Sequence, residues 1–278
     1  MALYCVISAG GAPGATTTAL GLALTWPGKV LLAECDPAGR RVLSGFMADR
    51  LKGPAGPGLL GLAMAVQANP NGAAAALEEY TLPLTQDGEA RLLHGIHDPR
   101  QVRQLARLWR PLADTFMAQD GDVIADLGRV GGAETPVGLL EAADVVVMVL
   151  RPTLGQVDAA LPRLEVLREV VGEGAQIRLC LIDDGAYSAA EVQRVLGHPI
   201  TAELPCSPPD ARVLSDGAAP RLTFNASLLM RGLETMGRRV RKAAEEAGRA
   251  DASSEETDTA AQAVQPSPAA AASAGGGR

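Results

Sequence analysis

The sequence predicts an α/β protein: a doubly wound, mostly parallel sheet with helices on both faces. Short aliphatic runs alternate along the chain with longer segments of helical periodicity, which is the pattern of successive β-α-β units. The runs are apolar throughout instead of alternating between polar and apolar, as is typical of parallel strands covered on both faces. Because crossovers between parallel strands are right-handed, we expect the helices on alternate faces of the sheet.

The aliphatic runs predict strands at residues 3–8, 29–34, 122–126, 144–150, 176–182 and 199–204. The segments between them predict helices at about 16–25, 99–117, 135–142, 153–171, 188–196 and 225–247. Together these elements describe one domain over residues 1–249.

Two segments depart from the alternation. Residues 50–96 open on a loop rich in glycine and proline and continue with apolar stretches at 59–66 and 73–79, so we expect an insertion whose helices pack beside the sheet. Residues 250–278 are rich in Ala, Ser, Gly, Pro and acidic residues and almost lack large apolar side chains. Such a composition does not repay the entropy of ordering, which predicts a disordered tail.

Composition and charge exclude several classes of protein. The 278 residues suffice for a buried core without disulfides or a structural metal, and the longest aliphatic run, Val145 to Leu150, is too short to cross a bilayer. The formal net charge of −7 argues against a surface built wholly to bind nucleic acid. No basic segment precedes the apolar stretch at residues 1–8, which is typical of a strand and not of a signal peptide. We therefore expect a cytoplasmic protein.

A loop of small residues follows the first expected strand, where residues 8–18 read S-A-G-G-A-P-G-A-T-T-T. A strand, such a loop and a helix together form an anion site, because bare backbone N–H groups and the helix dipole point at a phosphate. The segment fits a P-loop, G-x-x-x-x-G-K-[ST], with Gly14, Ala15 and Thr16 in its last three positions. It also fits a dinucleotide-binding loop with one substitution in G-x-G-x-x-G, in which Glu34 would hold a ribose.

The hydroxyls of Thr16, Thr17 and Thr18 favour the P-loop, because a phosphate that carries Mg²⁺ needs a hydroxyl after the loop and a dinucleotide does not. A glycine turn that holds no ligand is the third alternative.

Four ordered motifs resemble those of the MinD/ParA family of deviant P-loop ATPases, which includes pilus-assembly proteins of the TadZ or CpaE type. Residues 10–17 read G-G-A-P-G-A-T-T where the family has K-G-G-x-G-K-[ST]-T. Residues 34–39 read E-C-D-P-A-G, similar to D-x-D-P-x-G, and residues 122–128 read D-V-I-A-D-L-G, similar to D-x-[IV]-[IV]-x-D. Residues 204–217 resemble the turn and helix that contact the nucleotide base. The resemblance covers about residues 1–245.

The resemblance implies a site for ATP or ADP with Mg²⁺. It places the nucleotide-binding residues at Gly10, Gly11, Ala12, Gly14, Ala15, Thr16, Thr17, Asp183 and Pro205. It makes Thr16 a magnesium ligand, Asp36 the catalytic acid that orients water, and Asp126 the outer-shell anchor of the metal. All three are hard oxygen donors of the kind Mg²⁺ prefers.

The loop departs from the family at both of its lysines. The general P-loop lysine is replaced by Ala15, and the signature lysine that reaches across a sandwich dimer falls on Gly10. A hydrogen bond to a charged group is worth about 1.5–3 kcal/mol, and losing one preorganised donor costs roughly 10²–10³ in rate. The P-loop is therefore degenerate, and we expect a pseudo-ATPase with impaired hydrolysis.

Arginine is the common basic residue of this chain and has the charge to replace lysine. Four arginines follow the expected strands at the right end of the sheet: Arg40, Arg41, Arg129 and Arg151.

The resemblance and the degenerate loop together indicate a positioning or regulatory scaffold that binds protein partners through switch-like segments near Asp36 and Asp126. The first alternative is an active ATPase that dimerises with Mg-ATP and takes part in chromosome partitioning, division-site positioning or pilus positioning. The second alternative is a dinucleotide-binding oxidoreductase. A homodimer is a candidate assembly. Basic residues of the last helix are candidates for weak contact with a membrane or DNA: Arg238, Arg239, Arg241 and Lys242.

Overall fold

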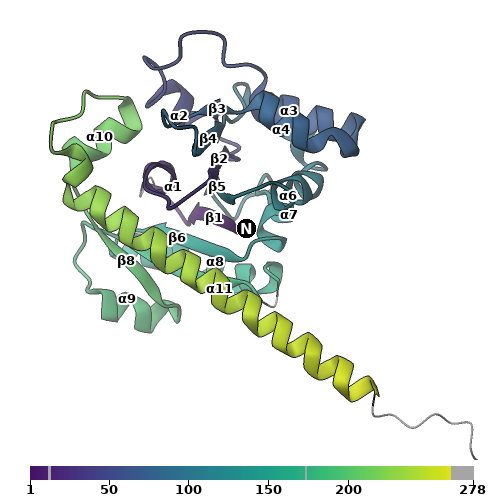
Figure 1. Cartoon of the computed structure of the whole chain (residues 1–278). Helices are drawn as coiled ribbons and strands as arrows, with labels where there is room; N and C mark the ends of the chain where they lie inside the picture. The colour runs from purple at the N-terminus through teal and green to yellow at the C-terminus, as the bar shows by residue number, and fades with distance from the viewer. Residues whose placement is uncertain (12–13, 173, 264–278) are drawn as a thin grey trace, which may run out of the picture.

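The computed structural model describes residues 1–11, 14–172 and 174–263. Within them, strands form one eight-stranded sheet in the order β3-β4-β2-β5-β1-β6-β7-β8 (Figure 1). The strands are β1 (Leu3–Ser8), β2 (Val30–Glu34), β3 (Leu82–Pro83), β4 (Ala90–Leu93), β5 (Asp122–Arg129), β6 (Val145–Leu150), β7 (Gln176–Asp183) and β8 (Ile200–Pro205). Neighbours pair in parallel except β3, which is antiparallel to β4. The predicted doubly wound α/β fold is confirmed.

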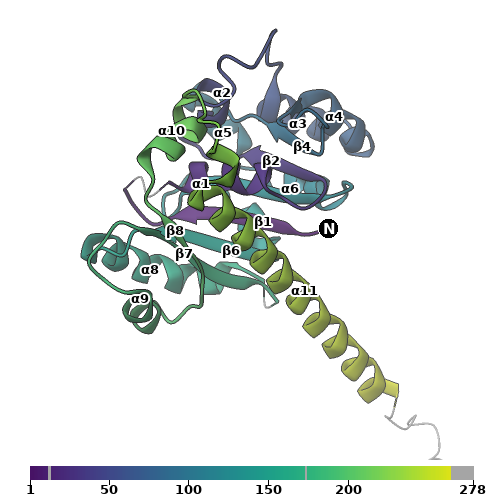
Figure 2. The same ribbon diagram turned by 60° about the vertical axis from the view of Figure 1, so that its left-hand side comes forward.

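Helices cover both faces of the sheet (Figures 1 and 2). One face carries α3 (Gly58–Ala68), α4 (Ala73–Tyr80), α5 (Val102–Leu105), α6 (Trp109–Met117), α7 (Val137–Glu141), α8 (Leu154–Val170) and α9 (Ala189–Leu196). The other face carries α1 (Ala15–Leu24), α2 (Arg41–Ser44), α10 (Pro208–Asp216) and α11 (Leu228–Ala263).

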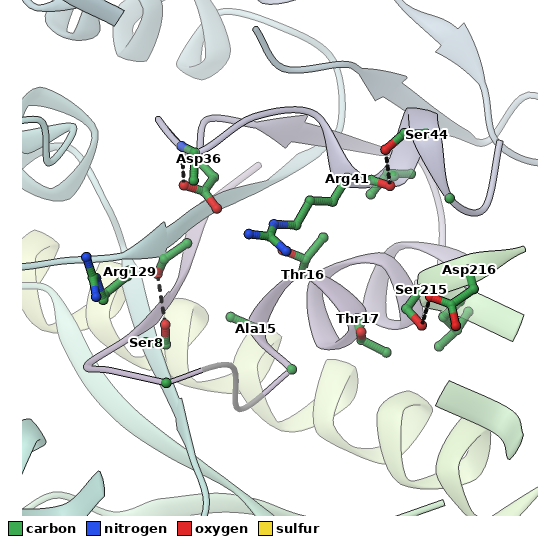
Figure 3. A pocket seen from close by; sticks show the side chains of 17 residues that line it. Ser8, Ala15, Thr16, Thr17, Asp36, Arg41, Ser44, Arg129, Ser215 and Asp216 are labelled. Atoms are coloured by element: carbon green, nitrogen blue, oxygen red, sulfur yellow. Dashed lines mark hydrogen bonds between the residues drawn. The ribbon is translucent and has the colours of Figure 1, made fainter. Parts of the chain in front are cut away.

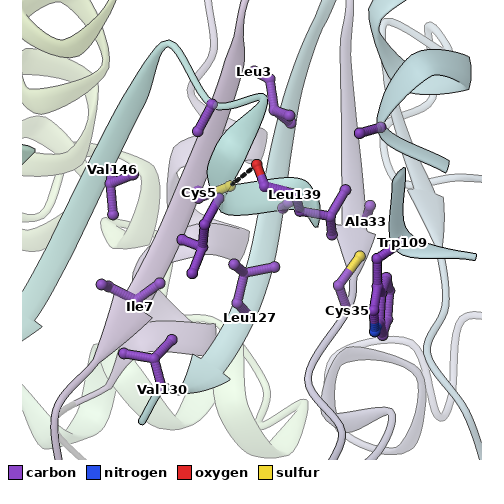
Figure 4. Close-up of a cluster of buried hydrophobic side chains, with 14 of the residues drawn as sticks. Leu3, Cys5, Ile7, Ala33, Cys35, Trp109, Leu127, Val130, Leu139 and Val146 are labelled. Carbon is purple, nitrogen blue, oxygen red and sulfur yellow. Dashed lines mark hydrogen bonds between the residues drawn. The ribbon is translucent and has the colours of Figure 1, made fainter. Parts of the chain in front are cut away.

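The central strand β1 divides the two cores. Its residues Leu3, Cys5 and Ile7 pack into the core under α6 to α8 (Figure 4), whereas Tyr4 and Val6 pack into the core under α1 and α11. Every residue of β1 is buried, so alternate side chains serve opposite layers and the strand reads as continuously apolar. In Figure 4 the Cys5 thiol points at the carbonyl of Leu139, to which it donates a weak 3.6 Å hydrogen bond.

The insertion contains two strands that the sequence does not reveal. The expected helices at 59–66 and 73–79 correspond to α3 and α4, but β3 and β4 also extend the sheet beyond β2. β3 has only two residues and includes Pro83, which fits an edge strand because proline has no N–H to donate to the ladder. Such short strands are defined by pairing with distant residues and have little periodicity of their own.

Two helices differ from their expected bounds. The helix expected at 99–117 is divided into three elements: a 3₁₀ turn at Pro99–Gln101, α5 and α6. Because α6 begins at Trp109, Pro111 lies in its first turn, where the N–H that proline lacks would have no helical partner. The last helix does not end near residue 247. α11 continues to Ala263, through alanine and glutamate residues that favour helix, although a disordered tail was expected from residue 250. Residues 264–278 lie outside the described residues.

Across the described ranges, none of the helices combines the length and apolar character that crossing a bilayer requires. This finding agrees with the short aliphatic runs of the sequence.

One carboxylate joins four elements at the edge of the sheet opposite the glycine-rich loop. Asp122, at the start of β5, accepts hydrogen bonds of 2.9 Å from the indole N–H of Trp26 and from the backbone N–H of Ala2. Its second oxygen also lies 3.3 Å from Nε of Arg241 on α11. The end of α1 and the middle of α11 are thereby tied to the starts of β1 and β5.

Replacing Asp122 with alanine is expected to lower the free energy of unfolding by about 2–4 kcal/mol, because buried N–H groups of Trp26 and Ala2 lose their acceptor. Urea unfolding of the purified variant measures this change. The control is Asp120→Ala, which removes only an exposed ion pair with Lys29 and should have a much smaller effect. Equal losses in the two variants would contradict the structural role of Asp122.

Candidate functional site

A cavity of about 820 Å³ opens where β1, β2 and β5 end and α1 begins (Figure 3). The carboxyl ends of parallel strands meet at one edge of the sheet, so residues far apart in the sequence converge there. Four segments supply its walls: Ser8, Gly11, Gly14, Ala15, Thr16 and Thr17 from β1 to α1; Asp36, Ala38, Arg41, Val42, Ser44 and Gly45 after β2; Gly128 and Arg129 from β5; and Leu214, Ser215 and Asp216 from α10.

The start of α1 is suited to an anion. Gly14 is the N-cap residue, and no acidic side chain lies in the first turn to neutralise the helix dipole. The first backbone N–H groups of a helix have no partner within the helix, so those of α1 are directed at the cavity. This geometry agrees with the phosphate-binding role that the sequence predicts for the loop.

The hydroxyl of Thr16 connects this helix to the sheet through Asp126. Thr16 donates a hydrogen bond to the carboxylate of Asp126, which also accepts a 3.1 Å bond from the backbone N–H of Gly128. Asp126 is only 1% exposed, and burial raises the pKa of its carboxyl to about 6 even though both hydrogen bonds lower it. A shift in register between Val6 and Ile7, where β1 pairs with β5, lies next to Asp126, as irregular pairing often does beside functional side chains.

Asp36 stands on the opposite wall of the cavity. One of its oxygens accepts a 2.8 Å hydrogen bond from the N–H of Ala38, and burial raises the pKa of the carboxyl while Arg41 and Arg129 lower it. The carboxylate rests against Gly128, whose φ is 60° and where an added Cβ would lie 2.2 Å from the Asp36 Cγ. Glycine at 128 is therefore required for Asp36 to reach this position.

Thr16, Asp36 and Asp126 fit a magnesium ion that is held mainly by a phosphate. Mg²⁺ usually takes one or two protein oxygens and fills its remaining positions with phosphate oxygens and water. Within the described residues, His, Cys, Asp and Glu side chains form no group of three or more that would hold a metal by themselves. A bound phosphate would have to supply the remaining ligands.

The loop side of the cavity lacks a cation among the described residues. Ala15 is buried and presents a methyl group, and a Cβ added to Gly10 would meet only Ala159 of α8, at 3.7 Å. The cationic side chains that line the cavity are those of Arg41 and Arg129, which come from outside the loop.

The other two candidate arginines are placed differently. Arg40 does not line the cavity, and Arg151 forms an ion pair with Asp184 beside a second cavity.

The predicted nucleotide-binding residues are divided among several places. Gly11, Gly14, Ala15, Thr16 and Thr17 line the main cavity, whereas Gly10 does not. Pro205 lines the second cavity, of about 300 Å³, together with Gly14, Thr17 and Ile182, so the two cavities meet at the start of α1. Asp183 is exposed at the end of β7 and lines neither cavity. Ala12 lies outside the described residues.

The resemblance implies that residues 204–217 contact the nucleotide base, but it does not indicate that the end of α10 forms a wall of the main cavity. Ser215 and Asp216 line the cavity because α10 packs against α2, a contact between segments far apart in the chain. The glycines at 45 and 217 allow the backbones of the two segments to approach closely, but the sequence does not show that these two glycines lie together.

The basic residues of α11 are largely engaged within the protein. Arg238 pairs with Glu234 at 2.7 Å, Lys242 pairs with Glu246 at 3.5 Å, and Arg239 donates a 2.7 Å hydrogen bond to the carbonyl of Thr201. Arg241 pairs with Asp122 as described above. These contacts tie α11 to the rest of the protein, and the expected contact with a membrane or DNA stays a prediction.

Glu34 does not hold a ligand in this arrangement. It is 1% exposed, and its oxygens accept hydrogen bonds from the N–H groups of Val42, at 2.7 Å, and Gly95, at 3.3 Å. The carboxylate therefore fixes the loop after β2, and the ribose-binding role of the dinucleotide alternative is not supported. Burial, with a smaller contribution from the charge of Asp126, raises the pKa of Glu34 to about 7.

This pKa has a consequence for stability. Because the native carboxyl of Glu34 holds its proton more tightly than the unfolded one, its contribution to folding is greatest below about pH 4.5 and is lost as the pH rises to about 7. Relative to the wild type, Glu34→Gln should therefore gain stability across this range, by up to about 1.4 kcal/mol per pH unit. Urea unfolding of both proteins across the range tests this, and parallel curves would contradict it.

Comparison by sequence finds no relative: no protein-family model and no curated protein matches the chain. Comparison by structure finds close similarity in fold. The septum site-determining protein MinD of Pyrococcus horikoshii, solved with Mg-ADP, is 19% identical, with a TM-score of 0.68 over 88% of this chain and 98% of its own. A ParA family ATPase of Chlorobium tepidum is 16% identical, with a TM-score of 0.67 over 85% and 97%.

A putative plasmid partition protein of Borrelia burgdorferi, bound to AMPPNP, is 13% identical, with a TM-score of 0.65 over 87% of this chain and 98% of its own. Each likeness extends over nearly the whole of the other protein. The chain therefore has the P-loop α/β fold of the MinD and ParA ATPases.

Proposed function

We propose that this protein binds ATP or ADP with Mg²⁺ in the main cavity and acts as a positioning or regulatory scaffold with weak or absent hydrolysis. One observation carries the proposal. Thr16 and Asp36 line the cavity where a glycine-rich loop leads into α1, and Asp126 lies buried behind Thr16, but the loop has no lysine. The groups that hold a metal and a phosphate are thus present without the groups that speed phosphoryl transfer.

The nucleotide is supported by the similar structures. MinD of Pyrococcus horikoshii was solved with Mg-ADP, and the plasmid partition protein of Borrelia burgdorferi with AMPPNP. The second cavity beside Pro205 and Ile182 is the natural place for the base, because it joins the main cavity at Gly14 and Thr17. Asp183 follows directly after Ile182 and stays part of the proposed base site.

Weak hydrolysis is supported by the charge of the loop. A P-loop lysine stabilises the charge that develops on the transferred phosphoryl group, and Ala15 offers only a methyl group in its place. Asp36 remains to orient a water molecule, so the proposal leaves binding intact and removes most of the rate.

The scaffold role is supported by the surface around the cavity. Ala38 and Arg41 after β2 and residues 131–134 after β5 are exposed, so a partner has access to segments that adjoin a bound phosphate. We include a homodimer among these partners. The alternative is an active ATPase that dimerises with Mg-ATP. It is favoured only if the arginines restore both the rate of hydrolysis and the affinity for nucleotide that the two lysines would supply.

Calorimetric titration is expected to show Mg²⁺-dependent binding of ADP. Thr16→Ala should weaken the binding of Mg-ADP at least about tenfold, because the hydroxyl that would meet the metal is removed. The matched control is Thr25→Ala at the other end of α1, whose hydroxyl donates to the carbonyl of Gly21 far from the cavity. Failure of the wild type to bind any nucleotide, or equal affinities of the two variants, would contradict the proposed site.

Steady-state phosphate release with Mg-ATP should be equally slow for the wild type and for Asp36→Ala. The loop lysine is already absent from the wild type, and loss of one such preorganised donor costs roughly 10²–10³ in rate, so little turnover is left for Asp36→Ala to remove. A turnover that Asp36→Ala abolishes would instead support the active ATPase.

A further inference from the structure

The main cavity holds more negative charge than a phosphate site tolerates without a cation. Asp36 and Asp216 line it, and Asp126 lies buried behind Thr16. A nucleotide would add its own phosphate charges, of which one Mg²⁺ compensates only a part. In MinD and ParA proteins lysines of the loop meet this need, and here the loop offers Gly10 and Ala15. Another cation must therefore serve the site if it binds a phosphate with useful affinity.

The side chain of Arg41 enters the cavity from the wall opposite the loop. Figure 3 shows its guanidinium group between Thr16 and Asp36, above the start of α1. Its charge lowers the pKa of both Asp36 and Asp126, as expected of a cation close to both carboxylates. Among the cavity residues drawn in Figure 3, none is joined to the guanidinium by a hydrogen bond, so its N–H donors can meet a ligand.

The position of Arg41 is fixed by the backbone on either side of it. The buried carboxylate of Glu34 accepts the N–H of Val42, at the start of α2. At the other end of α2, a Cβ added to Gly45 would lie 1.9 Å from the carbonyl oxygen of Ser215, so α2 packs against α10 at backbone contact. This packing presents the Arg41 side chain to the cavity before any ligand binds, which limits the entropy lost on binding.

The other arginines near the site are engaged or more distant. Arg151 pairs with Asp184, and Arg212 pairs with Asp216 at 3.3 Å. Arg163 donates to the carbonyls of Val130 and Ala159.

Arg129 lines the same cavity but lies on its far side in Figure 3, beside Ser8 and away from Thr16. Arg41 is therefore the arginine best placed over the first turn of α1.

We propose that Arg41 binds the phosphates of the nucleotide in place of the lysine that the loop has lost. This inference rests on the proposed function and identifies the residue that makes binding possible in a degenerate loop. A guanidinium group can donate two parallel hydrogen bonds to a phosphate, whereas an ammonium group acts as a point charge, so one arginine can recover much of the lost affinity.

The test is the affinity of the full-length protein for Mg-ADP and Mg-AMPPNP, measured by calorimetric titration. Arg41→Ala should raise the Kd for both nucleotides about 10- to 100-fold, as expected for loss of a charge-assisted contact. Arg41→Lys should lie between this variant and the wild type. The matched control is Arg40→Ala, an adjacent arginine that does not line the cavity, and its Kd should equal that of the wild type.

A rescue experiment distinguishes replacement of the lysine from a general loss of charge. The double variant Ala15→Lys with Arg41→Ala should bind both nucleotides more tightly than Arg41→Ala alone, because the charge returns to the place where P-loops normally carry it. Thermal unfolding of each variant shows whether it is folded.

Two results would overturn the inference, and they differ in their meaning. If the wild type binds Mg-ADP and Arg41→Ala binds it equally well, Arg41 has no role while the proposed function stands. If the wild type binds neither nucleotide, the proposed function fails and the inference fails with it.

Discussion

The parallel pairing of β5 between β2 and β1 is the constraint on which the candidate site depends. It brings Glu34 directly beside Asp126 in register and places the ends of all three strands at one edge of the sheet. Burial on both faces then leaves these carboxyl groups with few ways to be satisfied. Asp126 is satisfied by Thr16 and Gly128, and Glu34 by the backbone of the loop that carries Arg41. The geometry of the cavity is thus a consequence of how the buried strand ends are hydrogen bonded.

The same arrangement separates two tasks that a P-loop usually combines. Binding a phosphate requires backbone N–H groups, a metal and positive charge near the ground-state ligand, whereas rapid hydrolysis requires charge placed where it develops in the transition state. Here the backbone N–H groups and the proposed magnesium ligands are kept, but among the described residues no cation comes from the loop. A cation supplied from the opposite wall by Arg41 suits the first task better than the second. Loss of the lysines is therefore compatible with a nucleotide that acts as a structural ligand.

The sequence predicted most of the fold because its long strands are buried on both faces and carry their signal locally. β1, β2, β6, β7 and β8 begin and end within one residue of the expected bounds, and β5 is longer at its end. The elements that were missed depend on distant contacts. β3 and β4 exist by pairing with each other and with β2. The family resemblance pointed to the loop, Thr16 and Asp36, which the structure brings together at the cavity, whereas the buried, satisfied state of Glu34 required the structure.

The candidate arginines show most clearly where sequence reasoning stops. Arg40 and Arg41 are neighbours of the same type, and their positions in the sequence give no reason to prefer one. The difference comes from the backbone around them, because the hydrogen bond from Val42 to Glu34 and the close approach of Gly45 to Ser215 turn α2 so that Arg41 lines the cavity and Arg40 does not. The placement of the Arg41 side chain in the cavity therefore depends on a buried carboxylate and a glycine. A degenerate nucleotide site can be judged only when such supporting residues are considered together with the loop.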